Sequence, residues 1–244
     1  MNSRDRRIKD MKENVYEANI RLPKEGLVKL TWGNVSEVDY NYNVIVIKPS
    51  GVPYSSMKPE QMVVTDLNGN VLEGQYKPSS DLPTHVILYK HFKDIRSVVH
   101  THSKYAVMWA QAHRDIPAYG TTHADTFYGP VPCTRDLTSE EIEQNYEVET
   151  GNVIVETFKN RLIESNAVPG VIVYGHGPFT WGNSVNKAVE NSIVLEEIAE
   201  MALHTEMLTV YRHPQISNNL LDKHYLRKHG VNAYYGQVEN SVRV

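Results

Sequence analysis

Short apolar runs separated by tight turns constrain the fold of this chain more than any other feature. Runs at 27–31 and 44–48 are each followed by a glycine-containing turn. Runs at 62–66 and 71–72 flank Asn68-Gly69-Asn70, a sequence typical of hairpin turns. Strands joined this closely pair antiparallel, because a parallel crossover needs about a dozen residues or more. The pattern therefore predicts a largely antiparallel sheet rather than a doubly wound parallel one.

Helical periodicity marks the segments around these strands. Apolar residues spaced three and four apart predict a helix that ends near Pro23: Ile8, Met11, Val15, Ala18 and Leu22. A capping box, Thr138-Ser139-Glu140-Glu141, opens another helix. Further helices are expected at 81–92, 105–112, 185–211 and 219–229, with a strand leading into His100 and another at 171–174. Helices placed at both ends and between strands can cover both faces of a sheet. We expect an α/β protein, a single-domain α/β/α sandwich with a central, largely antiparallel sheet flanked by helices.

Composition narrows the function classes. No repeat or linker divides the chain, so we expect one domain over 1–237 and a loose tail over 238–244. The net charge of −4 gives no footprint for nucleic acid or anionic membrane surfaces. No apolar run approaches the ~20 residues of a membrane span. The first residues lack the apolar core of a signal peptide, and Cys133 is the only cysteine. A reducing cytoplasm is the simplest location.

A His-x-His pair follows two β-branched residues in Ser97-Val98-Val99-His100-Thr101-His102-Ser103. Side chains alternate along a strand, so His100 and His102 are expected on one face. His176 follows the run at 171–174 and lies between two glycines. Three imidazoles fit a zinc site that keeps one position open for water or substrate. The alternatives are polar residues on a solvated edge strand and an incidental histidine at a capped strand end.

Small polar residues in turns form a second group. Asn34, Ser50-Gly51 and Ser79-Ser80 each lie beside a predicted strand or at a helix start. Hydroxyl, amide and free backbone N–H groups near a helix N-terminus suit a phosphate, although serines there are equally good N-caps. Asp81 could reach a metal or simply place charge at the helix start. Asp125 and Tyr234-Tyr235 are candidate proton-transfer groups.

Taken together, these segments resemble the class II aldolase/adducin family, most closely its ketopentose-phosphate epimerases. The resemblance runs in order from the first helix to Gln237. It is carried by Thr31-Trp32-Gly33-Asn34-Val35-Ser36, Lys48-Pro49-Ser50-Gly51, Lys77-Pro78-Ser79-Ser80-Asp81-Leu82-Pro83-Thr84-His85, His100-Thr101-His102-Ser103, Gly120-Thr121-Thr122-His123-Ala124-Asp125, Gly175-His176-Gly177-Pro178-Phe179, 221–230 and Ala233-Tyr234-Tyr235-Gly236-Gln237.

The resemblance implies a cyclic homotetramer with each active site between neighbouring subunits. It assigns a divalent metal, usually zinc (Zn2+) with Mn2+ or Co2+ as substitutes, to His100, His102 and His176, with Asp81 beside it. It assigns phosphate binding to Gly33, Asn34, Ser50, Gly51, Ser79 and Ser80. Asp125 and Tyr235 become the acid/base pair, with Tyr235 contributed across the subunit boundary.

The implied reaction is epimerisation at C4 of a 2-ketopentose phosphate by cleavage and re-formation of the C3–C4 bond. One alternative is a class II aldolase that releases its fragments from a sugar 1-phosphate. Aldolase relatives have glutamate where this chain has Asp81, which favours the epimerase. A second alternative, a non-enzymatic scaffold like the adducin head, is expected to lack metal ligands.

Overall fold

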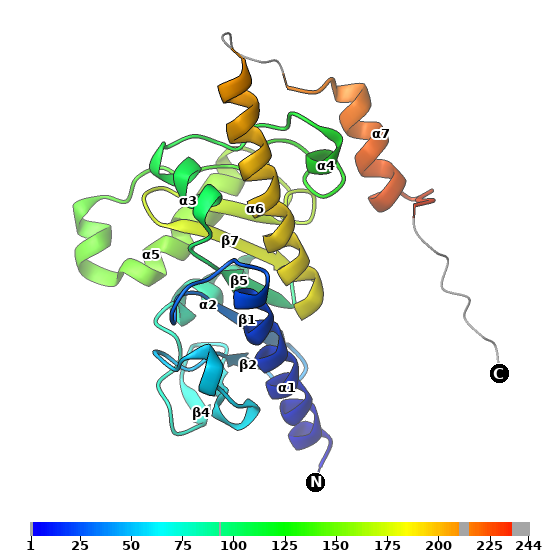
Figure 1. The fold of residues 1–244 in the computed structure, drawn as a ribbon. Coiled ribbons are helices and arrows are strands. Elements are labelled where there is room, and N and C mark those ends of the chain that lie inside the picture. The colour runs from blue at the N-terminus through cyan, green and yellow to red at the C-terminus, as the bar shows by residue number, and fades with distance from the viewer. Residues whose placement is uncertain (1, 93, 210–214, 236–244) are drawn as a thin grey trace, which may run out of the picture.

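The computed structural model describes residues 2–92, 94–209 and 215–235. One seven-stranded sheet forms its centre, in the order β4-β3-β2-β1-β5-β7-β6, and every pairing of neighbouring strands is antiparallel (Figure 1). The strands are β1 (Asn34–Asp39), β2 (Val44–Ile47), β3 (Val63–Asp66), β4 (Val71–Glu73), β5 (Ser97–His100), β6 (Gly170–Val173) and β7 (Gly177–Gly182). The predicted antiparallel sheet is confirmed.

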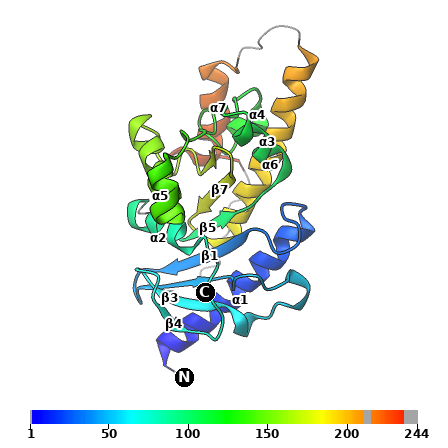
Figure 2. The same ribbon diagram turned by 90° about the vertical axis from the view of Figure 1, so that its left-hand side faces the viewer.

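Helices pack on both faces of this sheet. On one face lie α1 (Ser3–Lys24) and α6 (Val185–Leu208), and on the other α2 (Leu82–His91) and α5 (Ser139–Asn160), as Figures 1 and 2 show. The remaining elements are α3 (Lys104–Gln111), α4 (Thr121–Ala124), α7 (Asn218–His229) and two short 3-10 turns, η1 (Tyr54–Ser56) and η2 (Pro59–Gln61). The layers are those of the predicted α/β/α sandwich.

Alternation along the strands creates two hydrophobic cores. Val35, Val44 and Val46 pack against α1, whereas Ile45 and Ile47 belong to the core beneath α2 and α5. Successive side chains in a strand point to opposite faces, so two buried faces require apolar residues at nearly every position. The same alternation sends the even-numbered residues of β1 toward α2, where the candidate site lies.

The helices largely follow the sequence prediction. The periodic residues from Ile8 to Leu22 form the buried stripe of α1, and Thr138 caps α5 in the predicted capping box. The predicted strand at 27–31 is wrong, because Leu30 adopts a left-handed backbone conformation, with φ of 51°, that breaks an extended run. Its apolar residues Leu27 and Val28 instead join the core under α1.

The sequence does not predict β1 and β7. Asn34 begins β1, whereas its sequence pattern predicts a turn, and β7 follows His176 directly. In the part of the chain that the structure describes, no helix is long and apolar enough to cross a membrane. The predicted tail at 238–244 lies outside the described residues, and the domain boundary at 237 stays a prediction.

Candidate metal centre and active site

Three histidines converge at one end of the sheet. His100 is the last residue of β5, His102 follows two positions later, and His176 lies in the turn between β6 and β7. One ring nitrogen from each lies within 4.8 Å of those of the other two. Because β5 and β7 are neighbours in the sheet, pairing of these strands brings residues 76 positions apart in the sequence together.

A hydrogen bond orients the His100 ring as a metal site requires. His100 Nδ1 donates to the Pro178 carbonyl at 3.0 Å, which leaves the lone pair of Nε2 directed away from that bond. His102 Nε2 lies 3.1 Å from His100 Nε2. Two nitrogens bound tetrahedrally to one zinc, each at about 2.0–2.1 Å, would lie about 3.3 Å apart. The donor set and its spacing therefore fit a divalent metal such as zinc.

The protonation states also suit a metal. Burial lowers the pKa of His176 to about 3, and the neighbouring His100 and His102 add to this effect. Burial likewise lowers the pKa values of His100 and His102. All three imidazoles are consequently neutral at pH 7, and the neutral ring is the form that binds a metal.

One detail of the sequence prediction is wrong. Strand alternation predicts His100 and His102 on a single strand face, but β5 ends at His100 and His102 lies in the loop before α3. The two side chains still meet because the chain turns there toward α3. The His102 ring also faces the half-exposed indole of Trp32, with 6.0 Å between ring centres.

Asp81 is a partly buried carboxylate beside the three histidines. Its Oδ2 accepts a hydrogen bond of 2.6 Å from Asn34 Nδ2. Asn34 lies directly opposite His100 in the β1–β5 pairing, which places amide, carboxylate and imidazole together. Burial alone would raise the pKa of Asp81, but the nearby histidines and the Asn34 bond hold that pKa below its ordinary value. The ligand cluster of the three histidines does not include Asp81.

Four of the six predicted phosphate residues, Ser50, Gly51, Ser79 and Ser80, come from two segments that pair with each other. Ser50 N–H donates to the Lys77 carbonyl and Ser79 N–H to the Lys48 carbonyl, each at 2.9 Å. These two bonds flank a bridge between Pro49 and Pro78. The backbones of the Ser50-Gly51 and Ser79-Ser80 segments are thereby held next to each other. The N-cap of α2 is Asp81 rather than Ser79 or Ser80. The Ser79 hydroxyl nevertheless accepts a hydrogen bond of 3.4 Å from the Asp81 N–H, so one part of the capping alternative is observed at this helix start.

Gly33 is required by close packing at this site. Its φ is 75°, and a Cβ there would lie 2.8 Å from the His100 carbonyl oxygen and 2.7 Å from Val28 Cγ1. A side chain would push on the strand that carries the first metal ligand. Gly51 also has a positive φ, of 69°, but a Cβ there would meet open space.

Lys48 is a functional candidate that the sequence prediction missed. Its side chain is almost fully buried, and its ammonium lies 3.4 Å from the carbonyl oxygens of Thr31 and Pro49. Burial lowers its pKa to about 8, and the charge of Asp81 partly opposes that shift. A buried lysine is rare unless it is paired. The sequence feature that could have identified Lys48 is its position at the end of an apolar strand.

Asp125 and Tyr235 belong to a second cluster, formed by α4 and α7. The Asp125 carboxylate accepts hydrogen bonds from His224 at 3.0 Å and Arg227 at 2.9 Å, with the Lys228 ammonium at 3.2 Å. The exposed ring of Tyr235 lies 4.8 Å from the Arg227 guanidinium. Burial would raise the pKa of Asp125, but these donors lower it below its ordinary value.

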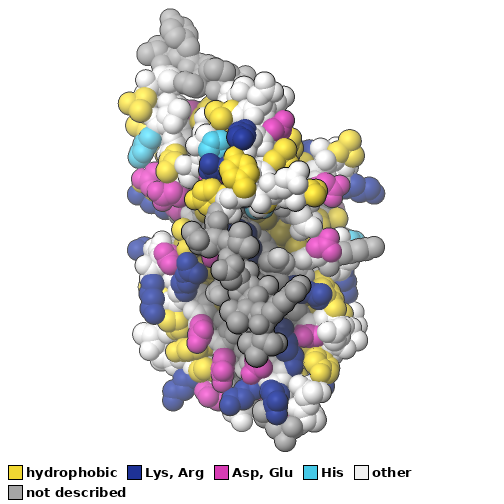
Figure 3. Space-filling model, turned by 90° about the vertical axis from the view of Figure 1, so that its right-hand side faces the viewer, with side chains coloured by type: hydrophobic (Ala, Val, Ile, Leu, Met, Phe, Trp, Pro, Cys, Tyr) yellow, Lys and Arg dark blue, Asp and Glu magenta, His cyan; other side chains and the backbone are white. Residues whose placement is uncertain are grey.

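Within one chain, no hydrogen bond, ion pair or ring contact joins Asp125 or Tyr235 to the three histidines among the described residues. Figure 1 shows α7 on the opposite side of the molecule from α5, whose Tyr146 hydroxyl lies 3.3 Å from His176 Nδ1. The face that carries α7 displays hydrophobic and basic side chains together (Figure 3). Leu226 of α7 and Tyr234, which follows α7, are exposed. The structure therefore separates the predicted acid/base pair from the predicted metal ligands of the same chain.

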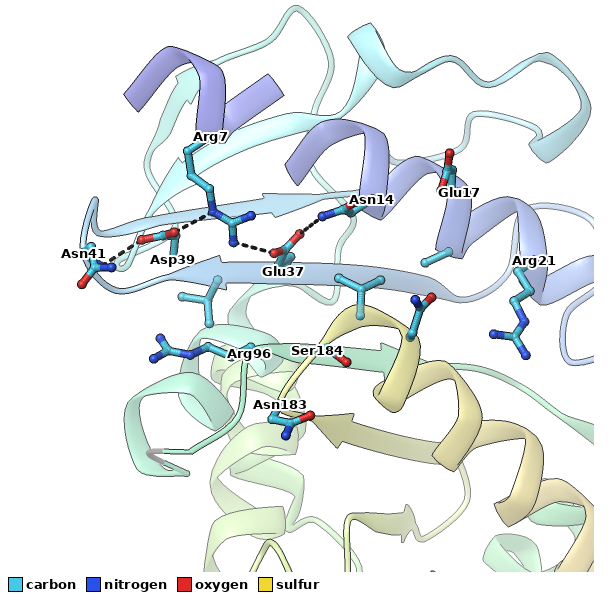
Figure 4. Close-up of a pocket in the computed structure, with 14 residues that line it drawn as sticks. Arg7, Asn14, Glu17, Arg21, Glu37, Asp39, Asn41, Arg96, Asn183 and Ser184 are labelled. Atoms are coloured by element: carbon cyan, nitrogen blue, oxygen red, sulfur yellow. Dashed lines mark hydrogen bonds and ion pairs between the residues drawn. The ribbon is translucent and has the colours of Figure 1, made fainter. Parts of the chain in front are cut away.

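A cavity of about 550 Å³ lies elsewhere, between α1, β1 and the start of α6. Figure 4 shows Arg7 between the carboxylates of Glu37 and Asp39, at 2.7 and 2.8 Å, and Asn14 beside Glu37. These charges are paired with one another, and none of the three clustered histidines lines the cavity. We interpret these ion pairs as a structural network that holds α1 on β1.

Comparisons with known proteins agree with this geometry. The family model of the class II aldolase and adducin N-terminal domain matches residues 13–203. An L-fuculose 1-phosphate aldolase is 25% identical, with a TM-score of 0.71, and the match covers 88% of this chain and 95% of that one. A second L-fuculose 1-phosphate aldolase, from Glaciozyma antarctica PI12, is 17% identical, with a TM-score of 0.73 and coverage of 89% and 80%.

A third similar structure is YgbL from Klebsiella pneumoniae, described with the alternative activities aldolase, epimerase and decarboxylase. It is 19% identical, with a TM-score of 0.67 and coverage of 88% of this chain and 98% of that one. The last two likenesses concern the fold alone, whereas the family model spans most of the chain, including His100, His102 and His176. The chain belongs to the class II aldolase/adducin family.

Proposed function

We propose that this protein is a metal-dependent L-ribulose-5-phosphate 4-epimerase, which interconverts L-ribulose 5-phosphate and D-xylulose 5-phosphate. The observation that carries the proposal is the convergence of His100, His102 and His176 beside the partly buried Asp81. The neighbouring pair of serine segments supports a phosphorylated substrate. Membership of the class II aldolase/adducin family supports carbon–carbon bond chemistry.

The chemistry explains why such a site suits an epimerase. The C4 hydrogen of a 2-ketopentose is not adjacent to the C2 carbonyl, so its removal would give an unstabilised carbanion. Cleavage of the C3–C4 bond instead leaves the charge on an enediolate, together with glycolaldehyde phosphate. Rotation of that aldehyde and renewed carbon–carbon bond formation on its other face give the C4 epimer.

Each group of residues has a separate role in the proposed reaction. A zinc or similar divalent ion held by the three histidines, with Asp81 proposed beside it, would supply Lewis-acid stabilisation of the negative charge on the C2 and C3 oxygens. Gly33, Asn34, Ser50, Gly51, Ser79 and Ser80 would hold the phosphate, so that the aldehyde turns without leaving. The ammonium of Lys48, buried beside these segments, would add positive charge.

Two proton-transfer groups are needed because the C4 hydroxyl lies on opposite sides in the two epimers. We assign these roles to Asp125 and Tyr235, each acting as base when one epimer is cleaved and as acid when it forms. Their separation from the histidines of the same chain supports a cyclic homotetramer in which one subunit completes the site of its neighbour. The exposed apolar side chains of α7 are the kind of surface that such an interface would bury.

A class II aldolase that releases its fragments is the second candidate. The two L-fuculose 1-phosphate aldolases among the similar structures favour it. Aspartate rather than glutamate at position 81 favours the epimerase, as the family resemblance implies. The metal and phosphate groups serve both reactions equally, so only the products distinguish them.

One assay separates the two candidates. Zinc-loaded protein is incubated with L-ribulose 5-phosphate and, separately, with L-fuculose 1-phosphate. The proposal predicts D-xylulose 5-phosphate from the first without free glycolaldehyde phosphate. Release of dihydroxyacetone phosphate from the second, with no epimer from the first, would establish the aldolase instead. Tyr234→Phe, next to Tyr235 and outside the proposed acid/base pair, is the matched control for Tyr235→Phe.

The proposal extends to the setting of the reaction. We place the enzyme in the cytoplasm and in the breakdown of L-arabinose, with L-ascorbate or L-xylulose breakdown as alternatives that use the same chemistry. Growth on each sugar after deletion of the coding sequence distinguishes these pathways.

A further inference from the structure

A buried histidine that the proposed chemistry does not use lies next to the site. His85 is near the start of α2, and its side chain has no exposed surface. Its Nδ1 lies 2.7 Å from Ser36 Oγ, and the same oxygen lies 2.7 Å from the Tyr89 hydroxyl. Its Nε2 has no hydrogen-bond partner among the described residues. Such an atom requires an explanation, because nearly all buried polar side-chain atoms are paired.

Tyr89, Ser36 and His85 form a series of hydrogen bonds, and counting its donors and acceptors determines which nitrogen of His85 carries the proton. Neither hydroxyl has another acceptor within the described residues. If Tyr89 donates to Ser36, and Ser36 donates to His85 Nδ1, only Nε2–H is left without a partner. Every other arrangement leaves at least two groups unpaired, one of which is a hydroxyl proton. The arrangement with fewest unpaired groups is a neutral imidazole with its proton on Nε2.

The sheet explains why this ring adjoins the active site. Ser36 and Asn34 are two residues apart on β1 and share the face that points toward α2, and Asn34 donates to Asp81. Burial lowers the pKa of His85 to about 3, although the charge of Asp81 opposes the shift. The effect of Asp81 on this pKa shows that the His85 ring lies close enough to interact electrostatically with the Asp81 carboxylate.

Phe179 provides a second link. Its ring stacks on His100 with 4.1 Å between ring centres, and it meets His85 edge-on at 6.1 Å. His85 thus lies beside both the carboxylate and the aromatic ring that supports the first metal ligand. On Asp81, Asn34 binds Oδ2, and Oδ1 has no hydrogen bond within the described part of the chain.

We propose that His85 is a positioning residue for Asp81, whose Oδ1 accepts the His85 Nε2–H when the site is engaged. The Ser36–Tyr89 pair fixes the proton on Nε2, and Asn34 and His85 then hold the carboxylate from both oxygens. A carboxylate held in this way keeps one orientation while the substrate fragment turns. The effect on catalysis rests on the proposed function, whereas the tautomer does not.

The tautomer is measured without any reaction. Protein labelled with ¹⁵N-histidine is examined by two-bond ¹H–¹⁵N correlation, with His85→Gln to assign the signal. The expected result is a neutral His85 with its proton on Nε2 at pH 7, with and without zinc. Ser36→Ala should convert this into a mixture of tautomers, whereas a proton on Nδ1 in the unaltered protein, or no change in Ser36→Ala, would overturn the proposal.

Kinetics test the consequence. His85→Gln retains an N–H donor and should stay within about threefold of the unaltered protein in kcat. His85→Phe should lower kcat about 10- to 100-fold, the usual loss when a group supporting a metal site is removed, with KM and bound zinc unchanged. In an Asp81→Asn background the same replacement should change kcat less than twofold.

These outcomes separate the two proposals. Equal losses in His85→Gln and His85→Phe, or a full further loss in the Asp81→Asn background, would overturn the positioning role. An unaltered protein that is inactive on both sugar phosphates would count against the proposed function, while the tautomer measurement would still support or contradict the assignment of the His85 proton.

Discussion

Replacing Gly33 by alanine tests whether backbone packing holds the metal ligands in place. An L-residue in the left-handed region costs about 1–2 kcal/mol, and loss of glycine from the unfolded chain returns about 0.4–1 kcal/mol. Both Gly33→Ala and Gly51→Ala carry this net cost, because φ is 75° and 69° at the two positions. Only at Gly33 would the new Cβ lie 2.8 Å from the His100 carbonyl oxygen.

The clash at Gly33 determines how much more Gly33→Ala should destabilise the protein than Gly51→Ala. Relieving it requires the His100 backbone or Val28 to move, at a cost of about 1–3 kcal/mol, as for other overpacked sites. We therefore expect the free energy of unfolding to fall by about 1 kcal/mol in Gly51→Ala and by about 2–4 kcal/mol in Gly33→Ala. Zinc affinity should fall about tenfold or more in Gly33→Ala alone, because β5 carries His100.

Equilibrium urea unfolding of the metal-free proteins measures the first quantity, and competition with a chromophoric chelator measures the second. Gly51→Ala is the matched control, since its strain is similar and its surroundings are open. Equal stabilities and equal zinc affinities for the two variants would refute the argument that Gly33 is needed for close approach to the ligand strand.

Three further predictions concern the metal and the second cluster. His102→Ala should lose bound zinc and activity together while its circular dichroism is unchanged, and the exposed His91→Ala should lose neither. The lowered pKa of Asp125 means that its hold on α7 is complete above about pH 4 and is lost as pH falls through its folded value. Hydrogen exchange of α7, followed stepwise from pH 6 to below pH 4, should show this loss, and Asp125→Asn should abolish the pH dependence. Mixing inactive His102→Ala and Asp125→Asn subunits should restore activity to about a quarter of the sites if neighbours share them; no restoration after subunit exchange would contradict the shared site.

Local patterns explain the elements that could be predicted from the sequence. The α1 stripe, the hairpin at Asn68-Gly69-Asn70 and the capping box at Thr138 each depend on residues within a few positions of one another. β1 could not be recognised in this way. Its Glu37 and Asp39 resemble loop residues, and they are tolerated in a buried strand because Arg7, some 30 residues earlier, binds both.

In the candidate site, too, local patterns identify some residues, whereas others depend on contacts between distant segments. The motifs identified His100, His102 and His176 separately, but their approach to 4.8 Å depends on the pairing of β5 with β7. Lys48 and His85 lie inside the motifs that carry the family resemblance, but those motifs imply no role for either residue. Their significance comes from burial and from partners on other elements, such as Ser36, which no short-range pattern contains.

The central claim is that the three histidines hold a metal that assists cleavage of a C3–C4 bond. The most direct test is to follow L-ribulose 5-phosphate by ¹H NMR in D₂O with zinc-loaded protein. We predict formation of D-xylulose 5-phosphate with its C4 hydrogen retained, since that hydrogen never leaves carbon in a retro-aldol route, and no reaction with His102→Ala. Deuterium at C4 of the product, or full activity of His102→Ala, would contradict the account.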